Sequence, residues 1–246
     1  MRGRFYGVGV GPGNPELLTV RAVSILKNCQ HVFVPKARSE GDSVALEIAR
    51  PYVHRDTQLH ELVFPMTADP EELAKRWKES AEAVATVLET GTDACFLTLG
   101  DPFVYSTYIY LLRALNTRLP GLEIITVPGI TSFCAAAALA NFPLGEGKEL
   151  VTIVPTADDL TAVRRALQCG GTVVLMKIGK RLHDILDLLD EAQLLDHSVF
   201  VARAGLEGQR VVLDLRELRL KLRAEAPEAG YLSVVLVHAN PHRSSQ

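Results

Sequence analysis

The sequence predicts an α/β protein of two lobes, each built on a roughly five-stranded sheet flanked by helices. Short apolar runs alternate with amphipathic helical segments through all 246 residues, the pattern of parallel α/β architecture. Apolar residues make up 48% of the chain and charged residues 22%, which is typical of a globular protein with an ample core. Pro128 and Gly129 resist continuing a regular element. We therefore expect one α/β domain over residues 1–127, a second over residues 128–246, and an active-site cleft between them.

The first half contains five apolar segments that predict strands, with four helical segments between them. These strands are expected at 5–10, 31–34, 59–64, 94–99 and 122–127. The clearest helix spans 70–89, because Asp69 is a plausible N-cap, Pro70 suits the first helical position and Gly91 can end the helix. Its buried stripe is expected to contain Leu73, Trp77, Ala81, Val84 and Leu88. On this pattern Trp77 is a core residue and not a stacking platform.

The second half repeats the alternation of strands and helices. Strands are expected at 149–154, 172–176, 198–203, 210–213 and 232–237, and helices at 158–168 and 181–191. Between two of these strands, Gly205 and Gly208 bracket a turn that is typical of a hairpin. A hairpin joins antiparallel strands, so the second sheet is expected to be mixed.

A glycine-rich turn follows the first strand and resembles a dinucleotide-binding loop without completing its pattern. The G-x-G-x-x-G spacing that starts at Gly9 places Asn14 where the third glycine belongs, and the spacing from Gly7 places Pro12 there. Pro12 and Pro15 also lack the backbone N–H groups that would hold a pyrophosphate. The turn is therefore expected to approach something closely, but not a diphosphate.

The sequence lacks the motifs and charge patterns that are typical of several classes of protein. It contains no H-E-x-x-H, G-x-S-x-G, C-x-x-C or P-loop motif, and its seven histidines are scattered, so we expect no metal site. A net charge of −3 offers no general attraction to nucleic acid. No apolar run reaches the roughly 18 residues of a membrane span, and the first residues do not read as a signal peptide. The four cysteines, Cys29, Cys95, Cys134 and Cys169, are expected to be reduced core thiols in a cytoplasmic protein.

Four loops that follow apolar strands are the candidate ligand-binding segments, because open α/β sheets bind ligands at the carboxyl ends of their strands. They comprise residues 100–107, 128–133, 177–180 and 202–205. In the first of them, Asp101 stands between a permissive glycine and a rigid proline, which fixes its carboxylate; the alternative is that it only caps the next helix. The small residues at 135–138 permit a close approach to a flat ligand, and close core packing explains them equally well.

These segments together resemble the tetrapyrrole methylase family of S-adenosylmethionine-dependent methyltransferases. The matching motifs are 9–19 (Gly-Val-Gly-Pro-Gly-Asn-Pro-Glu-Leu-Leu-Thr), 100–102 (Gly-Asp-Pro), 127–132 (Val-Pro-Gly-Ile-Thr-Ser) and Met176. They span the chain in the order that the family has. The segments 33–36, 105–108, 130–133 and 175–179 look most similar to enzymes that methylate carbon 20 of precorrin-2 or cobalt-factor II, and 32–36 favours the cobalt-factor II branch. One departure is Asn14, where relatives usually carry Asp; its turn-forming role survives that change.

The resemblance implies a two-lobed class III (tetrapyrrole) methyltransferase fold and a set of ligand contacts. Cofactor contacts are implied for Val10, Pro12, Leu99, Gly100, Asp101, Val104, Ser106, Thr107, Thr131, Ser132, Met176, Arg203, Ala204 and Leu232. Pro12 and Gly13 would face the macrocycle or shape the floor of the site. The tetrapyrrole carboxylates need cations, for which Lys36, Arg38, Lys177 and Arg203 are the candidates; solvated surface charge is the alternative for Arg38 and Lys177. Asp101 and Tyr105 are candidates to accept or relay a proton, and Lys177 is grouped with them as a catalytic candidate.

The implied activity is methyl transfer from S-adenosylmethionine, leaving S-adenosylhomocysteine, to a small-molecule tetrapyrrole in cobalamin biosynthesis. It asks mainly for alignment of donor and acceptor. The resemblance also implies a homodimer. The alternatives are methylation at another corrin position, of uroporphyrinogen III, or of a protein or RNA. A nicotinamide-dependent oxidoreductase and a pure binding module remain the alternatives from other classes.

Overall fold

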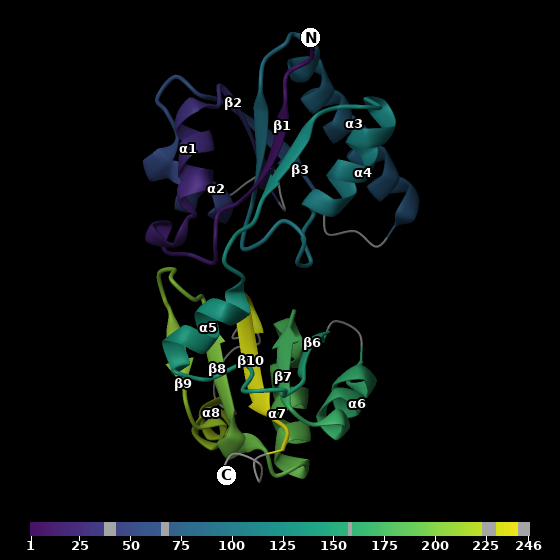
Figure 1. Cartoon of the computed structure of the whole chain (residues 1–246). Helices are drawn as coiled ribbons and strands as arrows, with labels where there is room; N and C mark the ends of the chain where they lie inside the picture. Colours follow the sequence, from purple (N-terminus) through teal and green to yellow (C-terminus); the bar gives the residue numbers. More distant parts are fainter. Residues whose placement is uncertain (37–42, 65–68, 157–158, 223–229, 241–246) are drawn as a thin grey trace. The chain divides into compact units, whose positions relative to one another are not determined.

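The computed structural model describes residues 1–36, 43–64, 69–156, 159–222 and 230–240 (Figure 1). The chain divides into two compact units, Met1–Thr131 and Ser132–Gln246, here called unit 1 and unit 2. This division falls four residues after the boundary expected from Pro128 and Gly129. No described helix is both long and apolar enough to cross a membrane.

Unit 1 is built on a fully parallel sheet with strand order β3-β2-β4-β1-β5. Its strands are β1 (Phe5–Gly9), β2 (His31–Lys36), β3 (Gln58–Val63), β4 (Ala94–Thr98) and β5 (Ile124–Val127). Its helices are α1 (Val20–Asn28), α2 (Val44–Ala49), α3 (Pro70–Glu89) and α4 (Tyr108–Arg118), with short 3-10 turns at Pro15–Leu17 and Arg50–Tyr52. Figure 1 shows α1 and α2 on one side of this sheet and α3 and α4 on the other. The parallel arrangement expected from the alternating pattern is confirmed.

Side-chain caps explain where the helices of unit 1 begin. Helix α3 has the predicted bounds, and the Asp69 side chain accepts a hydrogen bond from the Glu71 amide at 2.9 Å. Thr19 caps α1 in the same way, 3.1 Å from the Ala22 amide. Asn14 caps the first 3-10 turn by accepting from the Glu16 amide at 2.9 Å, so its turn-forming role is confirmed.

Unit 2 is built on a mixed sheet with strand order β6-β7-β10-β8-β9. Its strands are β6 (Val151–Pro155), β7 (Thr172–Met176), β8 (Ser198–Ala202), β9 (Arg210–Val212) and β10 (Ser233–His238). Its helices are α5 (Ser132–Ala140), α6 (Thr161–Cys169), α7 (Leu182–Glu191) and α8 (Leu215–Leu222), with 3-10 turns at Gly179–Arg181 and Leu195–His197. The hairpin is confirmed, because β8 and β9 pair antiparallel, and β10 is antiparallel to both of its neighbours.

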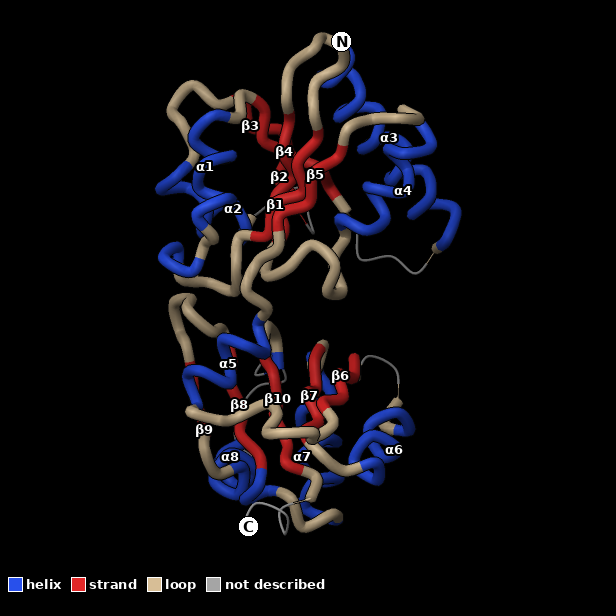
Figure 2. The backbone as a smooth tube through the Cα atoms, viewed as in Figure 1, coloured by secondary structure: helices blue, strands red, loops and turns tan. Residues whose placement is uncertain are grey.

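The core of unit 2 lies between the sheet and three of its helices. Helices α6, α7 and α8 bury apolar side chains such as Val163, Ile185 and Leu218 against one face of the sheet. Helix α5 packs against β8, β9 and β10 (Figure 2). Residues 157 and 158 lie outside the described part of the chain, so the expected start of a helix at Asp158 falls on residues that the structure does not describe; α6 itself begins at Thr161.

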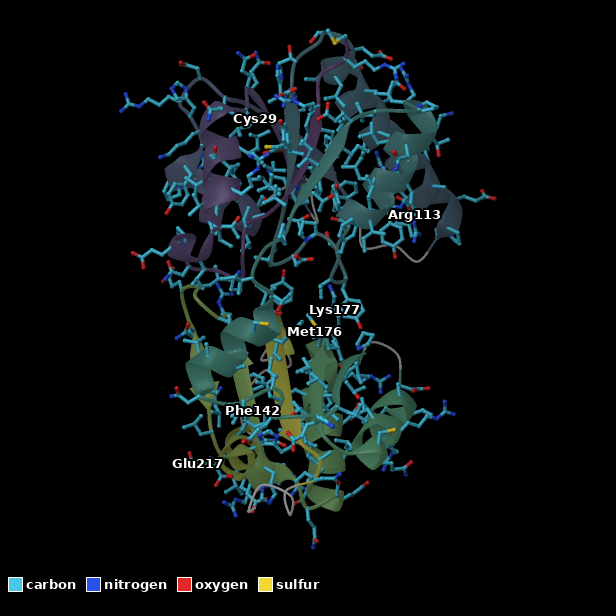
Figure 3. All side chains as sticks on the ribbon, viewed as in Figure 1. Cys29, Arg113, Phe142, Met176, Lys177 and Glu217 are labelled. Atoms are coloured by element: carbon cyan, nitrogen blue, oxygen red, sulfur yellow. The ribbon has the colours of Figure 1, made fainter. Side chains whose placement is uncertain are left out.

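Two of the four cysteines are not core thiols, which corrects the expectation from sequence. Cys29 (labelled in Figure 3) and Cys95 are buried in unit 1, whereas Cys134 and Cys169 are exposed. Both exposed cysteines lie on helices with a solvent side, α5 and the last turn of α6. Apolar neighbours in sequence misled the expectation, because a helix turns consecutive residues to different sides.

Candidate functional site

The glycines of the opening turn allow three loops of unit 1 to pack backbone against backbone. A Cβ added at Gly9 would lie 2.6 Å from the Gly129 nitrogen and 2.7 Å from the Gly100 oxygen. Gly11 and Gly100 form an isolated bridge, in which the Gly100 amide donates to the Gly11 oxygen at 2.8 Å and the Gly11 amide donates back at 3.3 Å. The close approach expected of this turn is thus an approach to the chain's own loops after β4 and β5.

Asp101 ties these loops together through both oxygens of its carboxylate. Oδ1 accepts from the Phe103 amide at 2.8 Å, within the same loop, and Oδ2 accepts from the Gly129 amide at 3.0 Å, in the loop after β5. Asp101 does not cap the next helix, α4, whose N-cap position is held by Thr107 without a side-chain hydrogen bond. Asp101 instead fixes the relative position of two strand-end loops.

The rest of the loop between β4 and α4 is held by short polar contacts. The Ser106 hydroxyl accepts from the Tyr108 amide at 3.0 Å and lies 3.2 Å from the Thr98 hydroxyl. Tyr108 is fully buried, with its hydroxyl 2.7 Å from that of Thr126, and this burial raises the pKa of Tyr108. Tyr105 is exposed and has a φ of 52°, in the left-handed region that few non-glycine residues adopt.

In unit 2, three of the expected site residues share this rare backbone conformation at one end of the sheet. Lys177 follows β7 with a φ of 58°, Arg203 follows β8 with a φ of 52°, and Leu232 precedes β10 with a φ of 51°. Because β10 runs antiparallel to β7 and β8, its beginning lies beside their ends. The Arg203 amide donates to the Leu232 oxygen at 2.8 Å. Each such conformation costs on the order of 1–3 kcal/mol, and strained residues gather at functional sites.

The sequence reasoning missed Thr156, which lies at the same end of the unit 2 sheet. Thr156 is fully buried, and its amide and its hydroxyl donate to the Met176 oxygen at 2.8 Å and 3.1 Å. Thr156 thus holds the end of β7 at Met176, just before Lys177; Met176 and Lys177 are labelled in Figure 3. The rule that ligands bind after strands would have found Thr156, since it directly follows β6.

The proposed carboxylate partners differ in their surroundings. Lys36 is ion-paired to Glu61, with 2.7 Å between Nζ and Oε1, and only 12% of its side chain is exposed. Lys177 is exposed, and no hydrogen bond or ion pair of its side chain occurs among the described residues. The Nε of Arg203 donates to the backbone carbonyl oxygen of Glu207 at 2.6 Å. Arg38 lies outside the described residues.

The remaining expected contacts fall on the same strand ends as these groups. Val10 and Pro12 are buried after β1, and Ala204 is buried after β8. Those that are partly buried are Leu99, Val104, Thr107, Thr131 and Ser132. The structure therefore brings the described candidates that follow the strands of unit 1 to the carboxyl end of its sheet. It brings Met176, Lys177, Arg203, Ala204 and Leu232 to one end of the unit 2 sheet.

Comparison with known sequences decides the family. The sequence pattern of the tetrapyrrole (corrin/porphyrin) methylases matches residues 4–219. The chain belongs to this family. The methylase is 36% identical to the cobalt-precorrin-2 C(20)-methyltransferase of Salmonella typhimurium, over 97% of each chain. It is 36% identical to the probable cobalt-precorrin-2 C(20)-methyltransferase of Methanocaldococcus jannaschii, over 85% of this chain and 86% of the relative, and 32% identical to the precorrin-2 C(20)-methyltransferase of a Sinorhizobium species, over 96% and 95%.

Solved structures show that the methylase has the expected fold. It superimposes on a cobalt precorrin-4 methyltransferase with a TM-score of 0.68 at 19% identity, covering 95% of this chain and 94% of the other. With the uroporphyrin-III C-methyltransferase of Thermus thermophilus, in complex with S-adenosylhomocysteine, the TM-score is 0.61 at 22% identity, covering 96% and 97%. The class III methyltransferase fold predicted from the sequence is confirmed.

Proposed function

We propose that this methylase transfers the methyl group of S-adenosylmethionine to carbon 20 of precorrin-2 or of its cobalt-containing counterpart, in cobalamin biosynthesis. The observation that carries the proposal is the 36% identity to a cobalt-precorrin-2 C(20)-methyltransferase along nearly the whole of both chains. Identity to relatives named for the cobalt-bearing substrate exceeds that to the relative named for precorrin-2, which favours the cobalt-bearing form.

The backbone amides of the opening turn support a cofactor without phosphate groups. A pyrophosphate would need free N–H groups around the turn, but four backbone amides there already donate within the protein. The Val10 amide donates to the Thr98 oxygen, Gly11 and Gly100 bond to each other, and Gly129 donates to Asp101. These bonds disfavour the nicotinamide-dependent alternative and fit S-adenosylmethionine, whose charged groups are an ammonium, a carboxylate and a sulfonium.

S-adenosylmethionine supplies an activated methyl group, so the protein's main task is to align donor and acceptor. On the family resemblance, we propose cofactor contacts for residues of the loop 99–107 and for Met176, Arg203, Ala204 and Leu232. Asp101 acts as a positioning residue, because both of its oxygens already accept backbone N–H groups.

Tyr105 remains our candidate to relay the proton that carbon 20 loses, since its side chain is exposed on the same loop. Tyr105→Phe keeps the ring and removes the hydroxyl. This variant should lower kcat and leave the affinity for S-adenosylhomocysteine intact, and an unchanged kcat would exclude the relay.

We further propose that the protein is a homodimer in the cytoplasm. The family resemblance supports self-association, and the buried thiols of Cys29 and Cys95 fit a reducing compartment. Light scattering of the purified chain tests the first point, and a monomer at micromolar concentration would refute it.

Calorimetry separates the methyltransferase from the oxidoreductase alternative. S-adenosylhomocysteine and NADH are titrated separately into the protein. Saturable heat with S-adenosylhomocysteine alone is expected. Heat with NADH alone would refute the proposed function.

A further inference from the structure

Aromatic side chains of unit 1 form a stack that starts at the carboxyl end of β3 and ends on the surface of α4. Phe64, just after β3, stacks on Trp77 of α3 with 4.6 Å between ring centroids, and Trp77 stacks on Tyr110 of α4 at 5.1 Å. The guanidinium carbon of Arg113, one turn further along α4, lies 5.9 Å from the Tyr110 centroid (Figure 3). The side chains of Phe64, Trp77 and Tyr110 are called the aromatic stack below.

Tyr110, at the outer end of the aromatic stack, is exposed, and so are two rings in the loop before α4. Tyr110 is 50% exposed, and Phe103 and Tyr105 in the preceding loop are 57% and 43% exposed. These three are among only four strongly exposed aromatic residues in the described part of the chain, and the fourth, Tyr231, is in unit 2. Large exposed apolar surfaces often mark the binding site of a ligand or partner. Their local contacts, such as the edge contact of Phe103 with Tyr108, leave outer ring faces uncovered.

Arg113 differs from its neighbouring arginines in having no acidic partner. Arg76 on α3 pairs with Glu79 at 3.1 Å, and Arg118 on α4 pairs with Glu82 at 2.6 Å and with Glu89 at 3.0 Å. Among the described residues no carboxylate lies within ion-pair distance of Arg113. Its guanidinium rests beside an aromatic ring and remains available to an incoming anion.

Two of these aromatic residues, Phe64 and Phe103, lie next to strand ends that carry the candidate site of unit 1. Phe64 donates its amide to the Lys36 oxygen at 2.8 Å, and Phe103 donates its amide to Asp101. Exposed ring faces beside an unpaired guanidinium suit a flat ring system that carries carboxylates, because the rings can stack while the guanidinium makes paired hydrogen bonds to a carboxylate.

Building on the proposed function, we propose that Phe103, Tyr110 and Arg113 form a binding surface for the tetrapyrrole substrate. Phe103 and Tyr110 contact the flat face of the macrocycle, and Arg113 pairs with one of its peripheral carboxylates. The buried part of the aromatic stack holds Tyr110 in place. These residues then contribute to substrate affinity and not to cofactor affinity.

The test uses uroporphyrin, a stable planar macrocycle with peripheral carboxylates, as the probe. Its binding to the full-length protein is followed by its visible absorption band, and S-adenosylhomocysteine binding is measured in parallel by calorimetry. The variants are Arg113→Ala, Arg113→Lys and Tyr110→Leu, with Arg76→Ala as the control that removes a nearby paired arginine.

Arg113→Ala is expected to weaken uroporphyrin binding on the order of tenfold, because a charge-assisted pair is lost. Arg113→Lys should fall between Ala and wild type, since it keeps the charge but not the planar fork. Tyr110→Leu should weaken binding roughly threefold to tenfold. Arg76→Ala should bind uroporphyrin as wild type does, and S-adenosylhomocysteine affinity should be unchanged in all four variants.

Two results would overturn this inference while leaving the proposed function intact. In the first, the wild-type protein binds both ligands, and Arg113→Ala and Arg76→Ala bind uroporphyrin with equal affinity. The other is an equal loss of both ligands in Arg113→Ala, which would show a general structural defect. Binding of neither ligand to the wild-type protein would overturn the proposed function as well.

Discussion

The carboxylate of Asp101 accepts the amide hydrogen of Gly129, with 3.0 Å between Oδ2 and the nitrogen. The two residues belong to loops that follow different strands, β4 and β5, so this one hydrogen bond sets the spacing of two segments that the sequence marks as ligand-binding. The other carboxylate oxygen of Asp101, Oδ1, accepts a hydrogen bond from the Phe103 amide. Asp101 therefore holds the two loops in position, and replacing its side chain tests this role.

Asp101→Ala should reduce methyl transfer at least tenfold, because the loops after β4 and β5 lose their shared anchor. Two backbone N–H groups also lose their acceptor, at a cost of about 1–3 kcal/mol in the free energy of unfolding for each one that stays buried. Asp101→Asn keeps the shape of the side chain but only one acceptor oxygen, so its turnover and stability should lie between those of Asp101→Ala and wild type. Turnover is measured with radiolabelled cofactor and stability by urea unfolding. Wild-type turnover in Asp101→Ala would remove Asp101 from the site.

Gly9→Ala should destabilise unit 1 by about 1–3 kcal/mol, because the added methyl group would lie 2.6 Å from the Gly129 nitrogen. A suitable control is Gly121→Ala, at an exposed turn with a φ of 75° and no atom within 4 Å of the added methyl. That control measures the cost of backbone strain alone. The free energy of unfolding of both variants is measured in urea. If the Gly9→Ala variant is no less stable than the Gly121→Ala variant, the close packing of the loops is contradicted.

Thr156→Val should weaken S-adenosylhomocysteine binding several-fold, since the hydroxyl that helps to fix the Met176 oxygen is lost. The Thr156 amide still donates to that oxygen, so the loss of stability should stay near 1 kcal/mol. Thr156→Ser keeps the hydroxyl and should restore the affinity. Calorimetric affinities that match wild type in Thr156→Val would show that Thr156 does not position the cofactor contacts.

The stability of the protein should fall as the pH falls through the range where histidine titrates. Burial, and secondarily the nearby His31, lower the pKa of His60, whose Nε2 lies 3.0 Å from Nδ1 of His31. The neutral form is then favoured in the folded state, and the unfolded chain binds more protons below its own pKa of about 6.5. The stabilisation is therefore present above that pH and lost below it.

Unfolding free energies at about pH 7.5 and 5.5 measure this effect. His60→Gln should show a smaller decrease between the two pH values than wild type, whereas His183→Gln, at an exposed position on α7, serves as the control. Burial also lowers the pKa of His238, so part of the decrease should persist in His60→Gln. An identical decrease in wild type and His60→Gln would count against the assignment.

Much of the fold could be predicted because local signals and the fold agree. Helix α3 has the predicted bounds, since Asp69, Pro70 and Gly91 each mark an end by local chemistry. Strand ends were less certain: β5 begins at Ile124 and not at Leu122, and β1 ends at Gly9, one residue early. Single hydrogen bonds continue beyond both strands, from the Val10 amide to the Thr98 oxygen and from the Phe5 amide to the Glu123 oxygen, so a sequence pattern cannot fix the last paired residue.

The parts of the site that the sequence could not predict depend on contacts between distant segments. The bond between Asp101 and Gly129, the hold of Thr156 on Met176 and the ion pair of Lys36 with Glu61 all join residues at least 20 positions apart. Nothing in the local sequence specifies such partners. Trp77 was expected in the core, but it is only half-buried. Its ring stacks between Phe64 and Tyr110, because α3 and α4 pack side by side.

The position of the transferred methyl group tests the central claim most directly. The protein is incubated without oxygen with ¹³C-methyl S-adenosylmethionine and, in separate reactions, precorrin-2 and its cobalt-containing counterpart, and the products are examined by NMR. The account predicts the label at carbon 20, with faster turnover of the cobalt-bearing substrate. A label at another carbon, or none on either macrocycle, would contradict it.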